Sequence, residues 1–320
     1  MATPSDSENL SKPLAARVKE WLFTEGYPLE FGCASVFREH RFSVRQGQHV
    51  IDERGSAPRE IDVLADRTVV RDDLVTRIHH VIECKYSRDK PWVVFTSRYG
   101  SIAPSACVAQ TIGSLTGDTL LWALAGDAGL EGLDHFATPS QPGFGARQAF
   151  SKGQDQVYAA LQSVTTLATL VANRHDQSER TPMEAVKYAA IAFPVIVVDG
   201  ELFEAHFDET TGSVEVTEVG RIRLHWRGSA SWSRHATLDI VRYSDLAKFA
   251  EQRAKDTTIL ANRLSSAHSC LRESVRERDL SSFSISAGPR GIMGRPRLYR
   301  ELATLLSADD EKQGRPEKGG

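Results

Sequence analysis

The chain has 320 residues, a formal net charge of −3, 41% hydrophobic residues and 25% charged residues. This composition is ordinary for a globular protein, and it excludes nucleic-acid binding driven by overall basicity, although a local basic cluster is compatible with it. No apolar run is long enough to span a bilayer, and the polar first residues lack the apolar core of a secretory signal, so we expect a cytoplasmic protein without membrane contact.

The first part of the chain predicts two helices followed by a meander of three strands. Residues 1–12 are polar and are expected to be disordered. Apolar residues recur at helical spacing in 14–25, and Pro28 suits the first turn of a second helix. Three segments then have the composition of strands, with a turn-forming stretch at 53–59 after the first of them: 41–52, 60–66 and 77–87.

The rest of the chain alternates between segments that are hard to interpret and clear helix or strand patterns. Residues 97–150 are rich in Gly, Ser, Pro and Ala, so we expect an insertion there, either a mobile lid or a substrate-contacting loop, with a short helix at 118–126. Residues 151–173 predict the clearest helix, and an apolar strand from 188 leads to Asp199-Gly200, which is typical of a hairpin turn. Further strands are expected at 212–219, 221–226 and 236–243.

Together these elements predict an α/β fold, with a central mixed β-sheet flanked by helices and a C-terminal helical extension. We expect one domain over 13–243, a helix over 244–280 that packs on its own domain or contacts another subunit, and a mostly flexible tail over 281–320 with one helical piece at 297–306.

The segment "VIECK", residues 81–85, places two opposite charges at the end of an apolar strand. Side chains alternate along a strand, so Glu83 and Lys85 should point to one face and Cys84 to the other. If the second and third strands are antiparallel neighbours, Asp62 faces Glu83 across the pair. Two carboxylates this close repel each other unless a proton or a cation lies between them, and Mg²⁺ prefers such oxygen ligands. The set therefore suits metal-assisted phosphodiester hydrolysis.

Pro58…Asp62 followed by Glu83-Cys84-Lys85 resembles the signature of the PD-(D/E)XK, or restriction-endonuclease-like, nucleases, and "PREIDVLA" resembles their Mrr and resolvase branch. The resemblance implies a restriction-endonuclease-like core with the order helix, three-stranded meander, helix, strand. It implies that Asp62, Glu83 and the backbone carbonyl of Cys84 bind Mg²⁺, for which Mn²⁺ can substitute, and that Lys85 positions and activates water. One departure is that Pro58 lies four positions before Asp62 instead of adjacent to it.

The same family often carries a further glutamate near the metal, on the helix that precedes the meander. Glu30 is the candidate that matches this position, and Glu20 and Glu25 on the preceding helix are alternatives.

Several other residues have both a functional and a structural interpretation. His79 and His80 could bind metal or act as a base, but one exposed and one buried strand histidine is the favoured reading. Gln154 and Gln156 could contact phosphate or water, or lie in a solvated first helical turn, and Trp92 and Phe95 could stack on bases or be buried. A set of basic residues could line a groove for phosphates or form a scattered solvated surface: Arg38, Arg41, Arg45, Arg54, Arg59, Arg77, Lys85, Arg88, Lys90 and Arg98. Cys33, Cys84, Cys107 and Cys270 have no CxxC spacing and are expected to be reduced thiols.

Three functions follow from this pattern. The first is a metal-dependent nuclease, a DNA endonuclease in the bacterial restriction or phage-defence setting that the family implies. The second is a catalytically inactive protein of the same fold that binds DNA or a partner protein, or forms a homodimer, through its C-terminal helix. The third is a metal hydrolase that acts on nucleotides.

Overall fold

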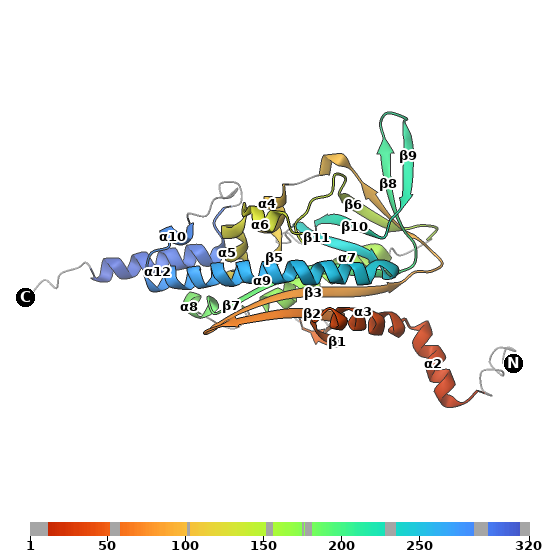
Figure 1. The fold of residues 1–320 in the computed structure, drawn as a ribbon, viewed down its shortest axis with the longest axis horizontal. Coiled ribbons are helices and arrows are strands. Elements are labelled where there is room, and N and C mark those ends of the chain that lie inside the picture. The colour runs from red at the N-terminus through yellow and green to blue at the C-terminus, as the bar shows by residue number, and fades with distance from the viewer. Residues whose placement is uncertain are drawn as a thin grey trace, which may run out of the picture.

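The computed structural model describes residues 12–51, 58–100, 103–151, 156–174, 176, 181–227, 235–284 and 294–313. The expectation for the first residues of the chain and the functional hypotheses for Gln154 and Arg54 fall outside these ranges. The described part is an α/β structure with one large mixed sheet of 11 strands and helices on both of its faces (Figure 1). The predicted fold class, a mixed sheet flanked by helices with a C-terminal helix, is confirmed at this level.

The two strands that carry the predicted site are 13 residues long each and lie second and third from one edge of the sheet. The predicted meander comprises β1 (Ser43–Val50), β2 (Arg59–Arg71) and β3 (Leu74–Tyr86), which pair antiparallel. On its other side β3 pairs in parallel with β7 (Tyr188–Asp199), which in turn is parallel to β11 (His235–Arg242). The carboxyl ends of β3, β7 and β11 therefore lie at the same edge of the sheet.

The remaining strands extend the sheet beyond β11. In spatial order they are β10 (Arg221–Arg227), β6 (Gly143–Gln148), β4 (Trp92–Thr96), β8 (Leu202–Asp208) and β9 (Ser213–Glu218), and the short β5 (Ile112–Gly113) pairs with β7 off this path.

Two layers of helices cover the faces of the sheet. The helix α7 (Gln156–Asn173) packs on β3 and β7 because Val157, Leu161 and Val164 recur at helical spacing and are fully buried. The opposite face carries α3 (Tyr27–Glu39) and α9 (Leu246–Arg276), and Figure 1 shows α9 running along the length of the sheet. The described helix α2 (Leu14–Thr24) buries none of its residues.

The segment 97–150, in which we expect an insertion, has helices and a strand that pack into the fold. It forms α4 (Pro104–Gln110), α5 (Leu115–Leu124), α6 (Ala128–Glu131) and the sheet strand β6. Leu120 and Leu121 are fully buried, and a Cβ added to Gly117 would lie 2.2 Å from the carbonyl oxygen of Ala190 on β7. The short helix predicted at 118–126 corresponds to α5. Because α5 is buried around nearly its whole circumference, it has no amphipathic pattern that would show which face packs on the sheet.

The prediction of a hairpin at Asp199-Gly200 is wrong, since β7 and β8 do not pair with each other. The strand β8 pairs in parallel with β4, while β7 lies between β3 and β11. A Cβ at Gly200 would lie 2.3 Å from the carbonyl oxygen of Ser87, so the glycine is required for a close crossing of two chain segments and not for a two-residue turn.

The C-terminal region adds further helices to the core. They are α10 (Ser281–Ser284) and α12 (Arg297–Gln313), whereas the short α8 (Pro182–Ala185) comes earlier, directly before β7. Within the stretch expected to be mostly flexible, α12 buries Leu298 and Leu302, and the ring of Tyr299 lies 5.3 Å from that of Trp122. None of the helices in the described ranges combines the length and the apolar character needed to cross a lipid bilayer.

Candidate active site

The predicted acidic residues lie on adjacent strands near the carboxyl end of β3. Val63 pairs with Ile82, so the antiparallel register brings Asp62 opposite Glu83. The backbone N–H of Cys84 donates a hydrogen bond of 2.7 Å to Oδ2 of Asp62. This hydrogen bond holds the carboxylate of Asp62 beside the backbone of Cys84, the residue between Glu83 and Lys85.

The strand β2 departs from regular alternation next to Asp62. Ile61 and Leu64 are three positions apart, so regular alternation would place them on opposite faces, yet both lie in the apolar cluster beneath α7. On the neighbouring strand β1, Gly47 has a φ of +60° and lies between the residues paired with Ile61 and Val63. The departure from regular alternation therefore affects both β1 and β2, and Gly47 adopts the positive φ that β1 has at this point.

Glu83 and Lys85 form an ion pair. The ammonium nitrogen of Lys85 lies 2.6 Å from Oε1 of Glu83, which agrees with the prediction that the two side chains share one face of β3. Ser163 of α7 donates a hydrogen bond of 3.2 Å to Oε2 of Glu83, whose residue is only 8% exposed. Ser163 is a site contact that the sequence interpretation missed, and its position on the core helix that packs on β3 is the signal that could have found it.

Glu30 joins the same cluster, although it comes from α3. Burial raises the pKa of Glu30 to about 7, and the negative charge of Asp62 adds to the effect. Burial also raises the pKa of Asp62 to about 6, with a further contribution from Glu83, while the Cys84 N–H opposes the shift. Burial lowers the pKa of Lys85, but the attraction of Glu83 outweighs it, so the net shift is upward. The four charged groups therefore act as one electrostatic cluster.

The alternatives to Glu30 do not join this cluster. Glu20 lies on α2, is about half exposed, and pairs with Lys12 at 2.5 Å. Glu25 is an exposed residue at the end of the same helix. Among the three glutamates, Glu30 is the one whose surroundings link it to Asp62.

The site offers oxygen ligands, the type that a hard divalent cation prefers, but it has only two carboxylates to hold one. Within the described ranges, no group of three or more His, Cys, Asp or Glu side chains is placed to hold a metal ion. The predicted set has two carboxylates and one backbone carbonyl, and Mg²⁺ is commonly held by one or two carboxylates with water completing its shell. The raised pKa of Asp62 beside Glu83 fits a site where a cation would relieve repulsion between the two carboxylates.

The two histidines before the motif do not reach the site, and the reading of one exposed and one buried histidine is wrong. His79 is 3% exposed, and its Nδ1 pairs with Asp66, which also pairs with Arg45. His80 is fully buried among aromatic rings, and burial lowers its pKa to about 3. Both belong to the core of the sheet because their strand is covered on both faces.

The other candidates divide between the core and the surface. Trp92 is fully buried in the cluster beneath α7, whereas Phe95 is 37% exposed. Gln156 is exposed at the first position of α7. Arg88, among the basic residues expected to line a groove, pairs with Asp199 at 2.9 Å.

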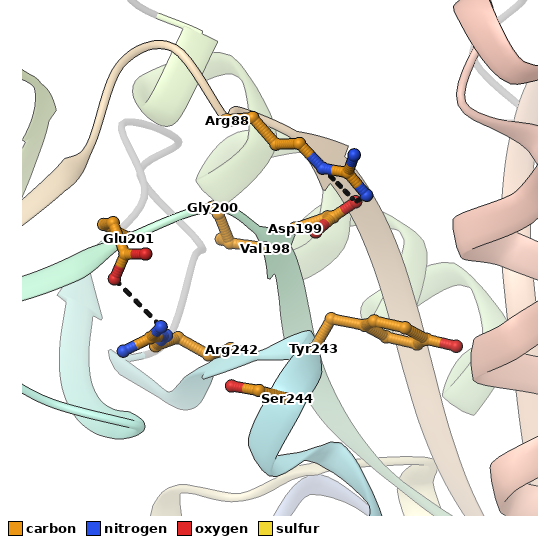
Figure 2. A pocket seen from close by; sticks show the side chains of 8 residues that line it. All are labelled: Arg88, Val198, Asp199, Gly200, Glu201, Arg242, Tyr243 and Ser244. Carbon is orange, nitrogen blue, oxygen red and sulfur yellow. Dashed lines mark hydrogen bonds and ion pairs between the residues drawn. The ribbon is translucent and has the colours of Figure 1, made fainter.

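A pocket of about 340 Å³ adjoins the site at the carboxyl ends of the parallel strands. It is lined by residues of β7 and β11 and the segments that follow them. Lys85 is next to this wall, because it lies opposite Val198 in the parallel pairing of β3 with β7. Figure 2 shows Arg88 turned towards Asp199 and Arg242 turned towards Glu201 across the opening. Tyr243 points from this wall towards α3, where a Cβ at Gly32 would lie 2.0 Å from its hydroxyl oxygen.

Two thiols lie directly behind the motif. The sulfur atoms of Cys33 on α3 and Cys84 on β3 are 3.6 Å apart, and all four cysteines are free. Cys84 therefore points away from Glu83 and Lys85, as alternation along the strand predicts.

Comparison of the chain with protein-family models, with curated proteins and with solved structures finds no match in any of the three. The family resemblance of the sequence motif therefore stays a prediction.

Proposed function

We propose that the protein is a Mg²⁺-dependent nuclease that hydrolyses phosphodiester bonds, as a DNA endonuclease of a bacterial restriction or phage-defence system. The observation that carries the proposal is the electrostatic cluster of Glu30, Asp62, Glu83 and Lys85, in which two carboxyl groups have a raised pKa. Such clusters of perturbed acids beside a lysine are typical of catalytic sites.

The arrangement of elements supports the restriction-endonuclease-like core that the motif implies. The helix α3 precedes the antiparallel meander, α7 follows it, and β7 then pairs in parallel with the strand that carries Glu83 and Lys85. This order matches the one expected from the motif, with 97–150 adding α4 to α6 and β6.

Each residue of the cluster has a role in this proposal. Asp62, Glu83 and the carbonyl of Cys84 would hold the ion, which supplies a bound water of lowered pKa and neutralises charge on the phosphate. Lys85 orients that water and donates to a phosphate oxygen. Glu30, with a pKa of about 7, exchanges a proton near neutral pH.

The test is cleavage of supercoiled plasmid DNA in Mg²⁺ or Mn²⁺, with EDTA as the metal-free control. We expect nicking by the wild type, and a loss of at least about 100-fold in rate for Lys85→Ala, because transition-state charge stabilisation of this kind has such magnitudes. Lys255→Ala is the matched control, since Lys255 is exposed on α9 and forms a surface ion pair with Glu251, one helical turn away.

Absence of nicking across metal concentrations, or nicking that survives Lys85→Ala, would contradict the proposal. Parallel reactions with RNA and with mononucleotides assign the substrate class, because a nucleotide hydrolase would turn over the mononucleotides instead.

One observation favours the non-catalytic alternative. Glu83 is already paired with Lys85 and with Ser163, so its charge is balanced without a metal ion. A protein of this kind would bind DNA or a partner with an affinity that EDTA does not change, and a chelator-sensitive complex would reject it.

A further inference from the structure

The strand β9 forms an open edge of the sheet on a hairpin that projects from the body of the molecule (Figure 1). Within the described ranges, β9 pairs only with β8, and its six residues are all exposed. Val214 and Val216 are 65% and 57% exposed. Edge strands present unpaired N–H and C=O groups, and proteins usually block them with lysine, proline or a bulge.

Lysine, proline and a bulge are absent from β9, whose charged side chains are the carboxylates of Glu215 and Glu218. Its sequence, "SVEVTE", has no lysine or proline, and the six pairs with β8 run without a register shift. The edge is therefore regular enough to accept another strand along its length.

A groove of about 370 Å³ lies beside this edge and is lined by aromatic side chains. The rings of Phe95 and Phe144 lie 6.4 Å apart, and Phe144 and Phe207 are 62% and 59% exposed. Val214 lines the groove and also belongs to β9, so the groove and the open edge form one continuous surface. Several exposed aromatic residues in one place mark an interaction site more strongly than single exposed residues do.

The charge of the hairpin defines the kind of partner. Residues 202–218 contain five carboxylates and no lysine or arginine, a net charge of −5 in a chain whose total is −3. The acids are Glu204, Asp208, Glu209, Glu215 and Glu218. Glu218 pairs with Arg242 of β11, and the other four carboxylates leave a local negative charge. This charge repels nucleic acid, and it also opposes edge-to-edge pairing with the same strand of a second copy.

We propose that the β9 edge and the adjacent aromatic groove bind an extended segment of a partner protein that carries lysine or arginine between apolar residues. The segment adds a strand to β9, its basic side chains meet the hairpin carboxylates, and one apolar side chain enters the groove. This inference does not depend on the proposed nuclease activity.

The test uses a fluorescein-labelled peptide in which valine alternates with lysine around one central phenylalanine, and a matched peptide with glutamate in place of lysine. Fluorescence anisotropy should show binding of the lysine peptide and at least tenfold weaker binding of the glutamate peptide. The double variant Glu215→Lys, Val216→Lys should lose at least tenfold in affinity for the lysine peptide. Val70→Lys, at a residue 66% exposed on β2, should not. Hydrogen exchange should show protection of the β9 amides when the peptide binds.

The proposal is overturned if both peptides bind equally, if the double variant binds like the wild type, or if no protection appears in β9. It is also overturned if β9 instead mediates a concentration-dependent dimer that the double variant abolishes, or if DNA displaces the peptide. Plasmid cleavage measured on the same double variant keeps the two proposals separate, because β9 contributes no residue to the acidic cluster.

Discussion

Replacing Asp62 with asparagine should make the protein more stable at neutral pH. The carboxylate of Asp62 is held among other acids, and its pKa rises from an ordinary value of 3.8 to about 6, mainly because burial disfavours its charged form. Asparagine has nearly the same shape, and its side-chain oxygen can still accept the hydrogen bond from the Cys84 N–H. The substitution therefore removes the unfavourable charge and keeps the contact.

The shift in pKa sets the size of the effect. A tenfold change in proton affinity corresponds to about 1.4 kcal/mol, so the charged form of Asp62 destabilises the folded state by up to about 3 kcal/mol. Below pH 3.8 the carboxyl group is protonated in both the folded and unfolded states, and the wild type and Asp62→Asn should be equally stable. Between pH 3.8 and about 6 the folded wild type binds a proton that the unfolded chain lacks, so its stability falls as pH rises.

Urea unfolding in EDTA at pH 4.5 and pH 8 measures the difference. We expect the variant to exceed the wild type by about 1–3 kcal/mol at pH 8 and by clearly less at pH 4.5. The control is Asp89→Asn, which neutralises an exposed acid in the loop after β3. A variant no more stable than the wild type at pH 8, or a gain of equal size at both pH values, would refute the reasoning.

Three further predictions concern the metal ion, the helix α12 and the thiols of Cys33 and Cys84. Mg²⁺ at ten times its dissociation constant should raise the unfolding free energy of the wild type by about 1.4 kcal/mol, and this gain should be absent in Asp62→Asn when both are followed by thermal unfolding. Leu302→Ala should lower the unfolding free energy by about 2–5 kcal/mol in urea, while Leu305→Ala, at a residue 40% exposed on the same helix, should change it little. The oxidant diamide should join Cys33 and Cys84, whose sulfurs are 3.6 Å apart, as a cross-linked peptide in mass spectrometry, and recovery of only unlinked peptides would contradict this.

The meander and the motif were predictable because both depend on local patterns. Strand alternation placed Glu83 and Lys85 on one face, and the spacing of β2 and β3 placed Asp62 opposite them. The irregularity at Asp62 was not predictable, since it depends on Gly47 in a neighbouring strand. Glu30 could be proposed only from the family resemblance, because a helix on the opposite face of the sheet gives no sequence signal of its distance from the site.

The errors have a common physical origin in long-range pairing. Asp199-Gly200 has the composition of a tight turn, but β4 takes the position beside β8 that β7 would occupy in a hairpin. In the segment 97–150, the short helix predicted at 118–126 corresponds to α5, but the way in which it packs was not predictable because α5 is buried on nearly all sides. Neither fact can be read from the residues near it, since the partners that decide each one lie elsewhere in the chain.

The long helix α9 connects two apolar clusters of the fold, so the chain does not divide into separate domains at its start. Near its start, Phe249 and Ala250 complete the apolar cluster that holds α3, and thus Glu30, against the sheet. Farther along, Leu260, Leu264 and Leu271 belong to a different cluster, shared with α5 and α12. A fragment ending at residue 243 would uncover apolar surface at both places, so the sheet and the helices that follow it should unfold together as one cooperative unit.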